Sequence, residues 1–146
     1  NTMKYLETGI TDYEKRLKHS MPFELKVFNI PSAKKNESPE KIKSIEAEII
    51  LKKLDGNDYL VLLDEQGKHY SSKQFANLMQ GYFNQVNGKL VFLIGGAFGF
   101  SDSVYQKANA KVSFSKMTMN HLLFRLVFLE QLYRSMTILK GEPYHH

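Results

Sequence analysis

The sequence predicts an α/β fold in which a parallel-rich sheet carries helices on both faces. Two short, continuous apolar runs, residues 58–64 and 90–96, are typical of strands that are buried on both sides. Segments with helical periodicity precede, separate and follow these runs, and such alternation favours a parallel sheet. A chain of 146 residues is long enough for one core, so we expect residues 1–146 to form a single domain.

The first half of the chain predicts two helices and an additional strand. Residues 3–18 place apolar side chains three or four positions apart, as an amphipathic helix does. In residues 22–30 the apolar side chains mostly alternate, which predicts a partly exposed strand. A second helix is expected over residues 39–54, because Ser38 can cap its first turn and Pro39 fits that turn.

The second half predicts three more helices around two strands. Ser71 or Ser72 can cap a helix that runs to about residue 86, where the sequence Asn-Gly-Lys favours its end. After the buried run at 90–96, the pattern predicts a short helix, a modest strand and a long helix, at residues 102–109, 110–115 and 120–139.

The long helix at 120–139 is apolar around most of its circumference. Leu122, Leu126, Leu129 and Met136 form one stripe, and further apolar residues extend beyond the arc that one sheet can cover. Large apolar surfaces seldom stay exposed, so we expect a second copy of the chain to cover this surplus. A central helix buried within one monomer is the alternative.

Composition narrows the classes of function. Twenty Lys and Arg residues against fifteen Asp and Glu give a net charge of +5, which suits a polyanionic partner such as nucleic acid but is also found in merely soluble basic proteins. The absence of cysteine excludes disulfides and thiolate catalysis and is compatible with a cytoplasmic setting. We expect no membrane span, because no apolar run is long enough, and no metal site, because the histidines lack ligand spacing.

A glycine-rich turn, "IGGAFGFS", follows the second buried strand. Ligands of open α/β sheets bind at the carboxyl ends of the strands, and glycine lets them approach the backbone closely. The order Gly95-Gly96-Ala97-Phe98-Gly99 matches neither the dinucleotide fingerprint nor a P-loop. The turn is therefore either a ligand site of another kind or a connection that simply needs glycine.

Two further loops leave predicted strands in the same way, at residues 62–72 and 113–125. Together with the glycine turn they can converge on one pocket, whose walls would include Leu63, Phe114 and the methionines at 117 and 119. Such a lining suits a flat aromatic ring that is held by main-chain hydrogen bonds.

Four motifs, in order, carry a family resemblance: "LLDEQGK", "LIGGAFGFS", "SFSKMTMNHLLFRLVFLEQLYRS" and the terminal "GEPYHH". The chain resembles the RlmH family of the SPOUT superfamily over essentially its whole length, and "MPFEL" at 21–25 agrees. The resemblance implies a homodimeric, S-adenosylmethionine-dependent methyltransferase with a C-terminal trefoil knot. Its implied substrate is the N-3 nitrogen of a pseudouridine in 23S rRNA of the assembled ribosome. A basic RNA-binding module of α/β fold without catalysis is the alternative function.

The resemblance also implies site residues. The implied cofactor-binding positions are Leu63, Gly95, Gly96, Gly99, Phe114, Ser115, Lys116, Met117, Thr118 and Met119. The implied substrate-binding residues are His121, Arg125, Tyr144 and His145, of which Arg125, Tyr144 and His145 are the catalytic candidates. A neutral His145 can accept the imide proton, although that proton can also leave to water. Family members begin with a short strand, so we expect about ten residues to precede Asn1 in the natural protein.

Overall fold

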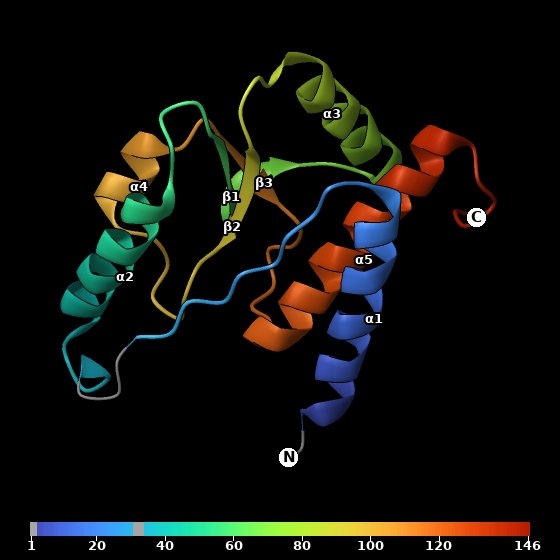
Figure 1. Ribbon diagram of the computed structural model, residues 1–146. Helices are drawn as coiled ribbons and strands as arrows, with labels where there is room; N and C mark the ends of the chain where they lie inside the picture. The colour runs from blue at the N-terminus through green and yellow to red at the C-terminus, as the bar shows by residue number, and fades with distance from the viewer. Residues whose placement is uncertain (1–2, 31–33) are drawn as a thin grey trace. The chain divides into compact units, whose positions relative to one another are not determined.

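The computed structural model describes residues 3–30 and 34–146, which contain five helices and three strands (Figure 1). The predicted helices are confirmed to within a few residues at each end. The elements, in chain order, are α1 (Lys4–Ser20), α2 (Pro39–Lys53), β1 (Tyr59–His69), α3 (Ser72–Gln85), β2 (Leu90–Ile94), α4 (Asp102–Lys107), β3 (Ala110–Ser113) and α5 (His121–Lys140).

The described chain divides into two compact units, each assembled from separate segments. We call the first the helical unit, and it contains α1, α3 and α5 within residues up to 25, 69–85 and 114–146. The second, the sheet unit, contains the strands with α2 and α4 within residues 26–68 and 86–113. That residues 1–146 form one domain stays a prediction.

The sheet unit is built on three strands in the order β2-β1-β3. β1 and β2 run parallel, with Tyr59 opposite Leu90 at one end and Leu63 opposite Ile94 at the other. This register confirms the predicted parallel pairing. It also means that the pairing of β1 with β2 ends at Leu63 and Ile94, at the carboxyl end of β2, and ligands of α/β sheets bind at the carboxyl ends of strands.

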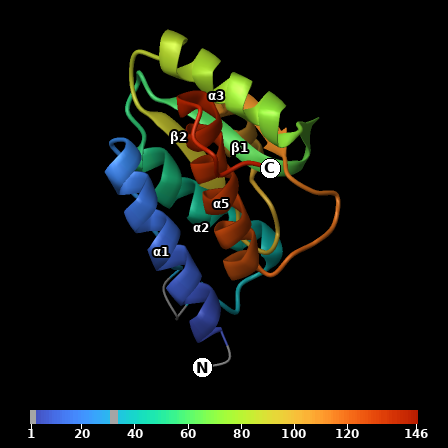
Figure 2. The same ribbon diagram turned by 90° about the vertical axis from the view of Figure 1, so that its right-hand side faces the viewer.

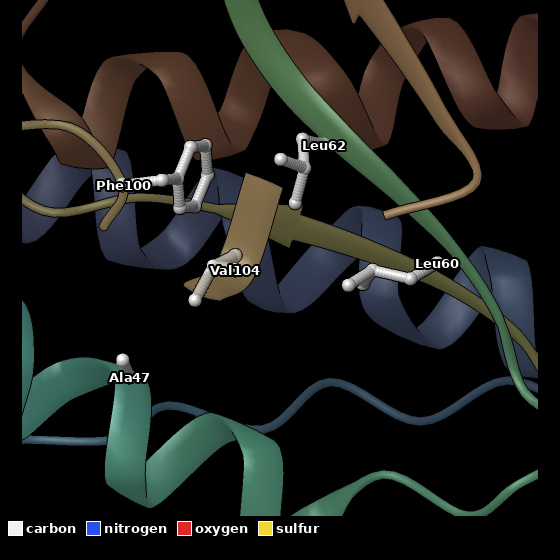
Figure 3. Packing of buried hydrophobic residues seen from close by; sticks show 5 residues of the cluster. All are labelled: Ala47, Leu60, Leu62, Phe100 and Val104. Atoms are coloured by element: carbon white, nitrogen blue, oxygen red, sulfur yellow. The ribbon is translucent and has the colours of Figure 1, made fainter. Parts of the chain in front are cut away.

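The buried run of β1 holds the sheet unit together. Leu60, Val61, Leu62 and Leu63 are all at most 5% exposed, so the strand is buried on both faces as predicted. Leu60 and Leu62 share one face because side chains alternate along a strand. On that face they form a cluster with a residue of α2, one of α4 and one between β2 and α4: Ala47, Val104 and Phe100 (Figure 3).

In the helical unit, α5 packs against both α1 and α3 (Figures 1 and 2). Gly9 of α1 allows close approach, because a Cβ there would lie 3.2 Å from the Leu126 methyl groups. On the other side, the ring of Phe114 packs against those of Phe75 and Phe128, with centroids 5.2 and 5.7 Å apart.

The ends of α5 are determined locally. The Asn120 side chain accepts hydrogen bonds from the backbone N–H groups of Leu122 and Leu123, at 2.9 and 3.4 Å, and so caps the first turn. Gly141 ends the helix with φ +71°, in the left-handed region that favours glycine. The predicted start and end of this helix are therefore confirmed.

Two strand predictions need correction. Residues 22–30 form no strand within the part of the chain that the structure describes, although their apolar residues alternate. Alternation indicates an extended backbone, but a strand also requires a regular ladder of backbone hydrogen bonds to a neighbouring strand, and the described sheet consists of β2, β1 and β3. Conversely, β1 continues to His69 through residues predicted to be a loop, since Gly67 lies directly against the backbone of β3.

Candidate functional site: the glycine loop and the C-terminal tail

The glycine loop after β2 is a tight turn. Gly96 and Gly99 form an isolated antiparallel bridge, in which the Gly99 N–H donates to the Gly96 carbonyl oxygen at 3.2 Å. Gly99 has φ +79°, a conformation that side chains with a Cβ rarely adopt. The turn therefore needs glycine for its geometry, whatever it binds.

The first two glycines of the loop leave no room for a side chain. A Cβ on Gly95 would lie 3.0 Å from ring carbons of Phe100, which is buried in the core of the sheet unit. A Cβ on Gly96 would collide with the Glu46 carboxyl group, contacting its Oε2 atom and lying 3.1 Å from Cδ. The space beside this backbone thus holds an aromatic ring and a carboxylate.

The carboxylate that follows β1's buried run is already engaged. The Tyr105 hydroxyl donates to Asp64 Oδ2 at 2.6 Å, and the Gln66 backbone N–H donates to Oδ1 at 3.2 Å. Burial, together with the hydrogen bond to Asp64, raises the pKa of Tyr105 to about 12. Asp64 therefore has a structural role, in linking β1 to α4.

In the helical unit, the segment 114–119 contains partly buried and exposed residues. The partly buried Phe114 packs its ring against rings of α3 and α5. The Ser115 hydroxyl accepts a hydrogen bond from the Met117 N–H at 2.9 Å, and this contact turns the chain toward α5. Met117 is 81% exposed, and Lys116 and Thr118 are exposed as well.

His121 and Arg125 lie one turn apart at the start of α5, on the same side of the helix. His121 is exposed and Arg125 is partly buried. These two side chains can both donate hydrogen bonds, and they follow the segment 114–119 in the chain.

Tyr144 is held in a network that joins the C-terminal tail to α1 and α5. Its hydroxyl donates to Glu130 Oε2 at 2.9 Å and lies 2.7 Å from the Tyr13 hydroxyl. The Arg134 guanidinium carbon sits 4.9 Å from the centre of the Tyr144 ring. Burial raises the pKa of Tyr144 above its ordinary value, and the hydrogen bonds to Tyr13 and Glu130 raise it further. The tail is therefore packed, with a neutral tyrosine at its centre.

His145 is oriented by the same network. Arg134 Nη1 lies 3.0 Å from His145 Nδ1, and Arg134 Nη2 pairs with Glu130 Oε2 at 2.7 Å. A guanidinium has only donors, so Nδ1 must accept and a neutral ring carries its proton on Nε2. In this arrangement the outward nitrogen of His145 donates a hydrogen bond, whereas proton acceptance by His145 requires the Arg134 contact to open.

Sequence reasoning missed Glu46, Tyr13, Glu130 and Arg134. The spacing of four residues between Glu130 and Arg134 was a usable signal for an ion pair on one helix face. Nothing in the sequence around Glu46 pointed to the glycine loop.

The structure places the predicted site residues in two groups. Four of them lie together at one edge of the sheet unit: Leu63, Gly95, Gly96 and Gly99. The others lie in the helical unit: residues 114–119, His121, Arg125, Tyr144 and His145.

The described ranges 3–30 and 34–146 contain neither a candidate metal site nor a candidate membrane span. No cluster of three or more histidine, aspartate or glutamate side chains there is arranged to hold a metal ion. Within the same ranges, no helix has the length and apolar character needed to cross a bilayer.

A parallel strand pair followed by a glycine loop is typical of α/β proteins, a class whose ligands bind at the carboxyl edge of the sheet. The family model described as "Predicted SPOUT methyltransferase" matches residues 1–145 of this chain. The protein belongs to the SPOUT methyltransferase family, whose members use S-adenosylmethionine as the methyl donor, and the resemblance drawn from its motifs is confirmed.

Curated relatives match almost the whole chain, and three of them carry the same name, "Ribosomal RNA large subunit methyltransferase H". The protein of Parabacteroides distasonis is 49% identical over 144 residues, which span 97% of this chain and 90% of that protein. The protein of Bacteroides thetaiotaomicron is 51% identical over 141 residues, which span 95% of this chain and 88% of that protein. The protein of Flavobacterium johnsoniae is 50% identical over 145 residues, which span 98% of this chain and 91% of that protein.

Proposed function

We propose that the protein transfers a methyl group from S-adenosylmethionine to large-subunit ribosomal RNA. The observation that carries this proposal is the identity of about half of all residues, over nearly the full chain, to proteins named for that activity. We further propose the acceptor to be the N-3 nitrogen of a pseudouridine in 23S rRNA of the assembled ribosome. The net charge of +5 supports an RNA substrate, because cationic side chains release the counterions of phosphates.

The glycine loop fits the proposed methyl donor. Gly95 and Gly96 let Phe100 and the Glu46 carboxyl group lie directly against the loop, and Leu63 adds a buried apolar side chain at the same edge of the sheet unit. Residues 114–119 would supply further backbone donors and acceptors, which suit an adenine ring. When bound, S-adenosylmethionine supplies an electrophilic methyl group on a sulfonium, so the protein has chiefly to align donor and acceptor.

The substrate side is proposed to consist of His121, Arg125, Tyr144 and His145. Arg125 is suited to neutralise the anion that forms when the imide nitrogen loses its proton, or to bind a phosphate. The Tyr144 ring can stack on the target base. With Nδ1 occupied by Arg134, His145 would hold a base oxygen through Nε2–H, and the imide proton would then leave to water.

The proposed assembly is a homodimer in which α5 meets its twin about a two-fold axis. The apolar surplus of α5 supports it, since Leu123 is 39% exposed and an open groove of about 420 Å³ lies between α1 and α5. Such a dimer would carry the tail of one protomer toward the cofactor loops of its partner. The groove between α1 and α5 is lined by Gly9, Tyr13, Leu123, Leu126, Val127, Glu130 and Gln131.

The resemblance also implies a C-terminal trefoil knot, helices on both faces of the sheet and a cytoplasmic setting. These three features are part of the same proposal.

Calorimetric titration with S-adenosylmethionine, followed by methyl transfer to ribosomes that lack the modification, tests the function. We expect saturable binding and transfer of one labelled methyl group to 23S rRNA. Gly95→Ala should weaken binding while the chain still folds, because the new Cβ presses on Phe100 and narrows the loop. If the wild-type protein binds RNA but not S-adenosylmethionine, it is an RNA-binding module and the proposal is wrong.

A further inference from the structure

Glu46 lies in α2 directly before Ala47, one of the residues in the core of the sheet unit. Ala47 belongs to the same cluster as Phe100, the residue that follows the glycine loop, so α2 is anchored beside that loop (Figure 3). Its neighbour Glu46 reaches Gly96, where the carboxyl group occupies the space that a Cβ would take. The absence of a side chain at Gly96 is therefore what admits this carboxylate to the loop.

The Glu46 side chain is partly buried. Among the residues that the structure describes, none forms a hydrogen bond or an ion pair with it. Asp64, which follows the buried run of β1, differs because both of its oxygens accept hydrogen bonds. Burial alone raises the pKa of Glu46, and no neighbouring charge counteracts it.

Partial burial makes the charged form of a carboxylate less favourable, and a cation that reaches the carboxylate offsets this cost. S-adenosylmethionine carries two cationic centres, the sulfonium and the α-ammonium group. We propose that Glu46 is a cofactor-binding residue whose carboxylate, admitted by Gly96, takes up a cationic centre of S-adenosylmethionine. This inference rests on the proposed function, and it adds a side chain to a site otherwise described by backbone and apolar groups.

The test compares three ligands by calorimetry on the wild type and on Glu46→Gln, which keeps the shape of the side chain and removes its charge. S-adenosylmethionine has both cationic centres, S-adenosylhomocysteine has only the ammonium, and 5′-methylthioadenosine has neither. We expect the substitution to weaken binding of S-adenosylmethionine about tenfold or more, as for other charge-assisted contacts. Binding of 5′-methylthioadenosine should not change.

Binding of S-adenosylhomocysteine, which has the ammonium group but no sulfonium, identifies the cationic centre that Glu46 contacts. A loss for S-adenosylhomocysteine as large as that for S-adenosylmethionine assigns Glu46 to the ammonium, and no loss for it assigns Glu46 to the sulfonium. The matched control is Glu48→Gln, which removes the same charge from an exposed position of the same helix and should leave all three affinities unchanged. Glu46→Asp, which retains the charge but withdraws it by one methylene, should weaken S-adenosylmethionine binding only partly, and it is the variant to use if Glu46→Gln does not fold.

Equal affinities in the wild type and Glu46→Gln, or the same proportional loss for all three ligands, would overturn the inference. In the first case Glu46 does not meet the ligand, and in the second it acts only by shaping the loop. Failure of the proposed function gives a different result, because the wild-type protein itself would then not bind S-adenosylmethionine.

Discussion

The guanidinium of Arg134 donates a hydrogen bond from Nη1 to the Nδ1 atom of His145, 3.0 Å away. Arg134 is itself held by two contacts to Glu130, from Nε and Nη2 at 3.3 and 2.7 Å. Arg134, a side chain of α5, thus orients His145, which lies eleven residues further along the chain. Because Arg134 can only donate, this contact selects one of the two neutral tautomers of His145.

Nitrogen chemical shifts should report this tautomer. At a pH where the imidazole is neutral, we expect His145 to carry its proton on Nε2 in essentially all molecules. Arg134→Met removes the donor and should allow both tautomers, whereas His121, which is exposed at the start of α5, provides the internal comparison. A proton found on Nδ1 of wild-type His145 would show that the Arg134 contact does not persist in solution.

Deletion of residues 143–146 should separate substrate recognition from the other properties. We expect dimerisation and S-adenosylmethionine binding to stay close to wild type, and methyl transfer to ribosomes to fall sharply. Loss of base stacking by Tyr144 alone is worth roughly 1–3 kcal/mol. Tyr144→Phe keeps the ring but not the hydroxyl, so it should lose less than the deletion. Unchanged turnover in the truncated protein would assign the tail to packing alone.

Two glycine substitutions should have opposite effects on stability. Gly67→Ala should destabilise the fold by about 1–3 kcal/mol, the usual result of overpacking. Its Cβ would lie 2.7 Å from backbone atoms of Lys111 and Val112, which cannot move aside without disturbing β3. Gly81→Ala lies within α3 and meets nothing within 4 Å, so it should stabilise the protein by about 0.5–1 kcal/mol. Chemical denaturation measures both, and a neutral Gly67→Ala would contradict the close approach of β1 to β3.

Glu46→Gln should make the ligand-free protein more stable at neutral pH. Since burial raises the pKa of Glu46, ionisation is less favourable in the folded than in the unfolded chain, and the wild type loses stability as the pH rises above the ordinary value of 4.5. The stability difference between variant and wild type should therefore grow as the pH rises from that value through the raised pKa of the folded state, and stay constant above it. Below it, where Glu46 is protonated in both states, the difference should disappear. Thermal unfolding across this range measures the effect, and a variant less stable than wild type at neutral pH would contradict it.

Sedimentation should find a particle of twice the 16.9 kDa of one chain at micromolar concentration. Leu123→Asp places a charge on the exposed apolar side of α5 and should shift the protein toward monomers, while circular dichroism shows that its helices persist. A wild-type protein that stays monomeric with an intact fold would rule out the proposed dimer.

Local chemistry allowed much of the secondary structure to be predicted from the sequence. Asn120 and Gly141 delimit α5, and Ser38 with Pro39 starts α2, because capping depends on residues within one turn. Burial of Leu60 to Leu63 on both faces was evident from an unbroken apolar run. The family, too, could be read from the sequence, because each of its motifs is a short continuous stretch of the chain.

The tertiary structure decided everything that depends on a distant partner. Residues 22–30 have a strand-like pattern but form no strand in the described part of the chain, and β1 extends beyond its apolar run because β3 lies against Gly67. Glu46 meets Gly96 only because α2 packs beside the glycine loop. Periodicity and capping express interactions within a few residues, whereas strand pairing and the environment of a carboxylate depend on segments that only the folded chain brings together.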